Sequence, residues 1–107
     1  MAWNIQNKEK YQLFSPTFSE EQELSDALLV VQTAKNKIVD ISLLTLTDSS
    51  VALLANVYEY HVARQVSFIV VVSSFENLDR LEEYFIVVPS ISEAIDYIYM
   101  EELERNV

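Results

Sequence analysis

The stretch that decides the fold reads Ile38-Val39-Asp40-Ile41-Ser42-Leu43-Leu44-Thr45-Leu46-Thr47-Asp48-Ser49-Ser50. It begins as an apolar run rich in branched side chains, which is the composition of a buried strand. It ends in short polar residues immediately before a pattern with helical spacing. The stretch therefore predicts a strand that leads directly into a helix.

Strands and helices alternate along the rest of the chain. The expected elements are one or two short strands in residues 1–15 around a polar turn at 7–10, a helix from Ser19 to about Ala34, the strand that begins at Ile38, a helix from about Ser49 to Arg64, a strand over 66–72, a short helix over 73–84, a strand over 85–88 and a final helix after Ser90. The strands at 38 and 66–72 are apolar without alternation, which is typical of strands covered on both faces. This order predicts an α/β domain with a largely parallel sheet.

The composition fits one domain spanning residues 1–107, because half of the 107 residues are hydrophobic. The chain contains no cysteine, so neither a disulfide nor a thiolate metal site can hold it together. The first residues lack the pattern of a secretion signal, and no apolar run approaches the roughly 20 residues that span a bilayer. We therefore expect a cytoplasmic domain that is stabilised by its hydrophobic core.

Seventeen acidic and seven basic residues give a net charge of -10. This charge repels phosphate backbones and anionic membranes, so we expect neither a nucleic acid nor a membrane as partner. A basic protein surface is one candidate partner, and solubility alone is the other explanation of the charge. In the final helix, Glu101, Glu102 and Glu104 are interpreted as a solvated face.

The residues that enzymes use are scarce. His61 is the only histidine, so a metal site built on two histidines is impossible, and we interpret His61 as a packed or half-exposed helix residue. The chain has no glycine, which excludes the glycine-rich phosphate loops and the glycine-flanked nucleophile elbow. Asp40, inside an apolar run, is expected to have a structural role. The sequence predicts no enzyme, no metal and no cofactor.

Asp48, Ser49 and Ser50 admit two interpretations. They can be an N-cap cluster, because short oxygen-bearing side chains satisfy the free amide donors of a helix start. They can also form a phosphorylation switch, because a phosphate at a first helical turn meets free amides and the positive end of the helix dipole. The residues alone leave both interpretations open.

The order of short motifs resembles the STAS family, which comprises sulphate-transporter and anti-sigma-factor-antagonist domains. The similar segments are Asp40-Ile41-Ser42 with Leu44, then Asp48-Ser49-Ser50, and later Val87-Val88-Pro89-Ser90-Ile91-Ser92-Glu93-Ala94-Ile95-Asp96, within a match over residues 37–105. The resemblance implies a mixed, mostly parallel sheet of about four or five strands with about four helices, mainly on one face. It also implies a cytoplasmic regulatory domain without catalytic activity.

Stand-alone members of that family bind an anti-sigma factor that is also a serine kinase, and they are phosphorylated on the second serine of the motif. The resemblance therefore implies Ser50 as the phosphoacceptor, with Ser49 as the second choice, and a partner surface made of Thr45, Thr47, Asp48, Ser49, Ser50, Val51 and Leu54. Val51 stands where the family usually has glycine. The alternative is a degenerate STAS-like module that binds a partner, or forms a weak homodimer, without a phosphorylation cycle.

Overall fold

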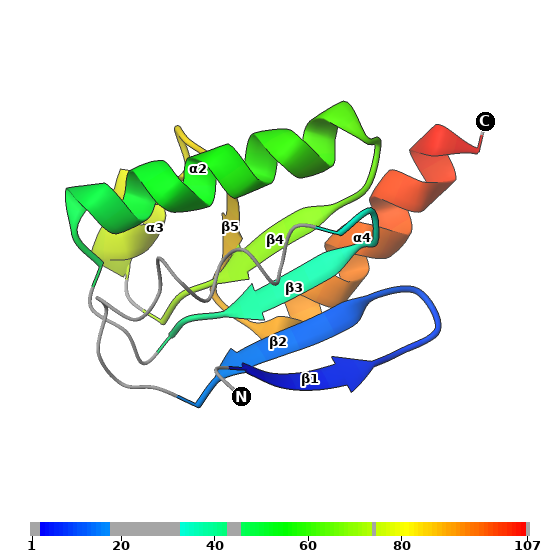
Figure 1. Ribbon diagram of the computed structural model, residues 1–107, viewed down its shortest axis with the longest axis horizontal. Coiled ribbons are helices and arrows are strands. Elements are labelled where there is room, and N and C mark those ends of the chain that lie inside the picture. The colour runs from blue at the N-terminus through cyan, green and yellow to red at the C-terminus, as the bar shows by residue number, and fades with distance from the viewer. Residues whose placement is uncertain (1–2, 18–32, 43–45, 74, 107) are drawn as a thin grey trace.

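The computed structural model describes residues 3–17, 33–42, 46–73 and 75–106, and Figure 1 shows the arrangement of their helices and strands. In chain order the elements are β1 (Trp3–Asn7), β2 (Gln12–Pro16), β3 (Lys37–Asp40), α2 (Asp48–Ala63), β4 (Phe68–Val71), α3 (Phe75–Leu81), β5 (Ile86–Val88) and α4 (Ile91–Arg105). The expected alternation of strands and helices after residue 37 is therefore confirmed. The helix expected from Ser19 to about Ala34 lies almost entirely outside the described residues.

The five strands form one sheet in the order β1-β2-β3-β4-β5. β1 and β2 make an antiparallel hairpin that places Trp3 opposite Pro16, whereas β2, β3, β4 and β5 run parallel to one another. The mixed, mostly parallel sheet is thus confirmed. Because the parallel strands point the same way, their carboxyl ends share the edge of the sheet where α2 begins (Figure 1).

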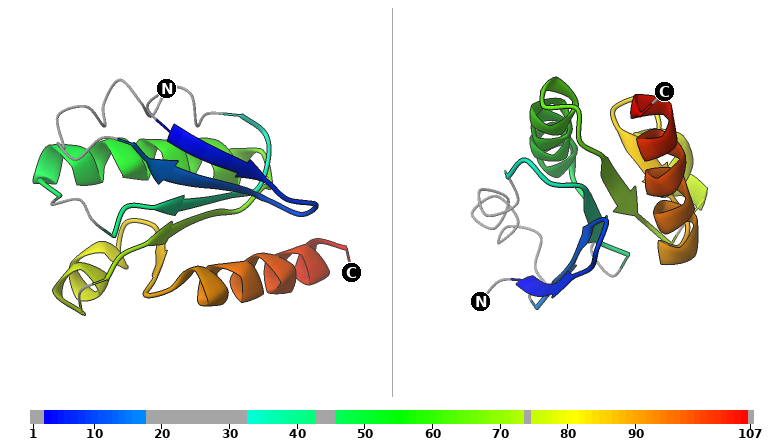
Figure 2. Two further views of the ribbon diagram at one scale, coloured as in Figure 1. Left: turned by 90° about the horizontal axis from the view of Figure 1, so that it is seen from below. Right: turned by 90° about the vertical axis from the view of Figure 1, so that its right-hand side faces the viewer.

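The helices flank both faces of the sheet, as the side views in Figure 2 show. On one face, Val39 and Val70 pack in a cluster with Leu54 of α2. On the other face, Ile38 and Ile69 pack in a second cluster, which includes residues of α4. This differs from the expectation of helices mainly on one face. The physical reason is that β3 and β4 carry apolar side chains on both sides, so both sides need a cover.

Helix α2 owes its position to one buried stripe. Ser50, Leu54, Val57 and His61 follow one another at spacings of three or four residues, and all four are buried. The helix ends in a Schellman motif, in which the Gln65 amide donates to the Val62 carbonyl and the Val66 amide to the His61 carbonyl. Gln65 occupies the left-handed region there with φ 59°, a position at which most proteins use glycine.

The start of α4 agrees with the expectation. Ser90 is its N-cap, and the Ser90 hydroxyl accepts a hydrogen bond of 3.2 Å from the Glu93 amide. Helix α3 ends at Leu81, three residues earlier than expected. None of the described helices is both long and apolar enough to cross a membrane.

Candidate contact site at the start of α2

The first turn of α2 lies at the carboxyl edge of the sheet, beside α3 (Figure 1). Thr47 is its N-cap, with an extended backbone, and the Thr47 hydroxyl accepts a long hydrogen bond of 3.4 Å from the Ser50 amide. The cap is therefore one residue before the Asp48-Ser49-Ser50 cluster. In parallel α/β sheets this edge is where binding sites usually form.

Arg80 of α3 connects α3 to this turn. One guanidinium nitrogen lies 2.6 Å from the Asp48 carboxylate, and the other donates to the Leu46 carbonyl at 3.2 Å. The Asp48 side chain is otherwise fully exposed, so the ion pair orders the surface and contributes little to global stability. Arg80 could not be selected from the sequence, because its two partners are more than 30 residues away along the chain.

The two adjacent serines differ in exposure. The Ser49 side chain is exposed, whereas Ser50 is only 1% exposed. The cause is helix phase: Ser50 lies four residues before Leu54 on the stripe that faces the sheet, and Ser49 lies next to that stripe. Ser50, the phosphoacceptor that the resemblance implies, is therefore inaccessible in the folded domain. Ser49, the second choice, is accessible.

The predicted partner surface needs a further correction. Val51 and Leu54 are 6% and 0% exposed and belong to the hydrophobic core, so they do not form an accessible surface. Thr47, Asp48 and Ser49 are exposed as a contact surface requires, and Thr45 lies outside the described residues. The periodicity of the sequence indicates the burial of Leu54 and of Ser50, because both lie on the same helical stripe as Val57 and His61.

A shallow hollow of about 250 Å³ lies between α2 and the α3 region, and it is lined by Asp48, Val51, Ala52, Arg80 and Tyr84. Tyr84 is 52% exposed although it is a large aromatic residue. Exposed aromatic and arginine side chains are enriched at protein interfaces. We call the set Thr47, Asp48, Ser49, Ala52, Arg80 and Tyr84 the α2–α3 surface.

Asp40 and His61 have structural roles, as expected. The Asp40 carboxylate accepts hydrogen bonds from the backbone amide and the hydroxyl of Ser42, at 3.1 and 2.7 Å, and so shapes the turn after β3. His61 is completely buried and stacks on Phe68 with ring centroids 4.8 Å apart. Among the described residues, no group of three histidine, cysteine, aspartate or glutamate side chains is arranged to hold a metal ion.

The fold has a clear counterpart among solved structures. The crystal structure of an anti-sigma factor antagonist from Mycobacterium paratuberculosis superposes with a TM-score of 0.72, covering 91% of this chain and 92% of that one. The chain has the STAS fold. The two sequences are 18% identical, so the likeness establishes the STAS fold and leaves the function to be argued from the site. No family model matches the sequence, and no curated protein matches it significantly.

Proposed function

We propose that this chain is a non-enzymatic regulatory domain of the cytoplasm that binds an anti-sigma factor through the α2–α3 surface. The main support is the likeness to an anti-sigma factor antagonist over nearly the whole chain. The surface itself offers exposed hydroxyls, an exposed ion pair and an exposed tyrosine around a shallow hollow. These groups suit contacts with another protein better than they suit catalysis on a small molecule.

The proposed partner is an anti-sigma factor of the serine-kinase type, and the proposed switch is a phosphate on Ser49. Ser49 is exposed in the first turn of α2, where a phosphate meets the positive end of the helix dipole. It would place roughly two negative charges beside Asp48 and change the charge of the contact surface. Phosphorylation of Ser50 would require this turn to open, because its side chain is buried against the sheet.

The surface is tested by one substitution at two places on the same helix. Ala52 and Ala63 are both exposed residues of α2, but only Ala52 lines the hollow. Tagged wild-type protein, Ala52→Arg and Ala63→Arg are expressed in the native cells, and captured proteins are identified by mass spectrometry. We expect the wild type and Ala63→Arg to retain an anti-sigma factor and Ala52→Arg to lose it. Absence of any anti-sigma factor from the wild-type capture, or equal capture by both variants, would contradict the proposal.

The switch is tested by the intact mass and by phosphopeptide mapping across residues 48–64 of the protein from native cells. We expect one phosphate, which Ser49→Ala removes and Ser50→Ala leaves in place. A phosphate that only Ser50→Ala removes would show that the first turn opens for the kinase, and our assignment to Ser49 would be wrong.

The second candidate is a degenerate module that binds its partner without a phosphorylation cycle. Two observations favour it: the second serine is buried, and Val51, at the position of the usual glycine, belongs to the core. In that case Ala52→Arg still abolishes capture of the partner, but no phosphate is found under growth or stress conditions. The two experiments together therefore separate the two candidates.

A further inference from the structure

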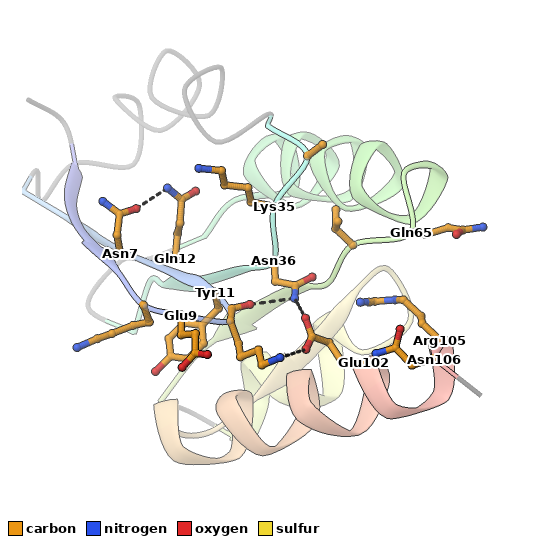
Figure 3. A pocket seen from close by; sticks show the side chains of 14 residues that line it. Asn7, Glu9, Tyr11, Gln12, Lys35, Asn36, Gln65, Glu102, Arg105 and Asn106 are labelled. Carbon is orange, nitrogen blue, oxygen red and sulfur yellow. Dashed lines mark hydrogen bonds and ion pairs between the residues drawn. The ribbon is translucent and has the colours of Figure 1, made fainter.

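The end of the domain opposite the α2–α3 surface contains a larger hollow. Four parts of the chain meet there: the turn between β1 and β2, the segment before β3, the end of α2 and the last turn of α4 (Figure 1). The hollow has a volume of about 890 Å³, and Figure 3 shows the side chains around it. Sites for small ligands usually fall in a range of about 300–1,000 Å³.

Basic residues gather at this end of an otherwise acidic molecule. Lys8, Lys10, Lys35 and Arg105 line the hollow, against the two carboxylates of Glu9 and Glu102. The chain has only seven lysine and arginine residues and a net charge of -10. Such a concentration of cations is unexpected if the acidity of the chain serves solubility alone.

Two further cations are neighbours in the sequence of residues that line the hollow, although neither lines it. The Lys37 ammonium donates to the carbonyls of Thr33 and Lys35 at 2.8 and 2.7 Å. Its burial lowers the pKa of Lys37 to about 8, so the group remains largely charged at neutral pH. Arg64 directly precedes Gln65, which lines the hollow. Of the seven basic residues, Arg80 alone belongs to the opposite end.

A hydrogen-bond network fixes the inner wall. The Asn36 amide nitrogen donates to the Lys10 carbonyl at 3.0 Å and to the Glu102 carboxylate at 2.8 Å, and Figure 3 shows this link. The Asn36 side-chain oxygen accepts from the backbone amide of Ser67 at 2.8 Å. The Arg105 guanidinium donates a hydrogen bond of 2.6 Å to the Ser67 hydroxyl oxygen, and it lies 3.7 Å from the Glu101 carboxylate. Hydrogen bonds between protein groups therefore hold this wall together.

The lysines at the rim are differently placed. Lys10 has a loose ion pair with Glu102, with the two atoms 3.5 Å apart. Lys8 and Lys35 are exposed, and within the described part of the chain neither side chain forms an ion pair. The ammonium groups of Lys8 and Lys35, at the rim of the hollow, are therefore available to an incoming anion.

We propose that this hollow binds a small organic anion that carries two or more carboxylate or phosphate groups. The lining is dominated by polar and charged side chains, which favours a highly charged ligand over an apolar one. Lys8 and Lys35 supply the attraction, and the wall formed by Asn36, Glu102 and Arg105 supplies the shape. The site is separate from the α2–α3 surface and does not depend on the function proposed there. Because its cations are exposed, binding weakens as salt is added.

The probes are pyrophosphate and citrate, titrated into the full chain by isothermal calorimetry at low ionic strength. We expect saturable binding of at least one probe, which the double variant Lys8→Gln/Lys35→Gln weakens by about tenfold. Stronger binding of pyrophosphate would identify a phosphate ligand, and stronger binding of citrate a polycarboxylate. Either result supports the site.

The matched control is Arg64→Gln, which also removes positive charge at this end. Its guanidinium lies 3.6 Å above the Tyr60 ring and donates to the Tyr60 carbonyl, outside the lining of the hollow. We expect it to bind the probe as the wild type does. The proposal is overturned if the wild type binds neither probe at millimolar concentration. It is equally overturned if the double variant binds like the wild type, or if Arg64→Gln loses as much affinity per charge removed, since either result would leave only a general effect of net charge.

Discussion

Acidification should destabilise this domain through His61. The ring is completely buried, and its Nδ1 lies 2.7 Å from the Val57 carbonyl, to which it donates. No described group accepts a hydrogen bond from Nε2. Burial lowers the pKa of His61, the hydrogen bond to Val57 opposes this, and the charges of Lys37 and Arg64 lower the pKa further. A proton added at Nε2 would therefore be buried without an acceptor.

The sign and size of the effect follow from proton linkage. The pKa of His61 in the folded state lies below the ordinary value of 6.5, so below that pH the unfolded chain binds a proton that the folded chain does not. The contribution of neutral His61 to the free energy of unfolding is fully present well above pH 6.5 and is lost as the pH falls. If the folded state remains unprotonated, the free energy of unfolding falls by about 0.8 kcal/mol at pH 6 and about 1.4 kcal/mol at pH 5.5. Protonation of the folded state makes both values smaller.

The assay is urea denaturation at several pH values between about 8 and 5.5, followed by tryptophan fluorescence or circular dichroism. Carboxylates also titrate toward the acid end, so the wild type is compared with His61→Gln, which retains every carboxylate. His61→Phe, which can stack on Phe68, is a second variant without a titrating ring. As the pH falls, the free energy of unfolding of the wild type should decrease relative to that of each variant. A difference that stays constant with pH in both comparisons would refute the reasoning about His61.

Two further predictions concern single side chains. Gln65→Gly should raise the free energy of unfolding by about 0.5–1 kcal/mol, because glycine removes the cost of the left-handed backbone after α2. Thermal or urea unfolding measures the gain, and Gln65→Ala, which keeps the Cβ atom, should show none. Asn36→Ala should lower the free energy of unfolding by about 2–3 kcal/mol, since it removes three hydrogen bonds from a buried amide. The exposed Asn4→Ala is the matched control, and an equal loss in both asparagine variants would contradict the assigned role of Asn36.

The elements were predictable where local chemistry determines them. Helix α4 begins directly after Ser90, as expected, and the polar run at 7–10 does join two antiparallel strands. The apolar runs of β3 and β4 were correctly interpreted as strands covered on both faces. These features depend on residues close in sequence, so a single sequence contains most of the information.

The site was predictable only in part, because exposure depends on helix phase and on distant residues. The start of α2 was located within one residue, yet the N-cap is Thr47, and the helix turns Ser50 toward the sheet. Arg80 reaches Asp48 only in the folded chain. The interpretation of Glu101 and Glu102 as a solvated face was likewise wrong. Their carboxylates accept hydrogen bonds from the Ser67 hydroxyl and the Asn36 amide, and these contacts hold α4 against the sheet.

The position of β1 has a consequence for behaviour in concentrated solution. β1 is an edge strand, its five residues Trp3–Asn7 carry no charge, and no described strand pairs with its outer side. Edge strands are commonly protected from joining another sheet by charged side chains. Because β1 has no charged side chain, repulsion between chains of net charge -10 at neutral pH opposes such pairing instead. Near the isoelectric point of about 4.3, where this charge vanishes, aggregation should begin by strand addition at β1.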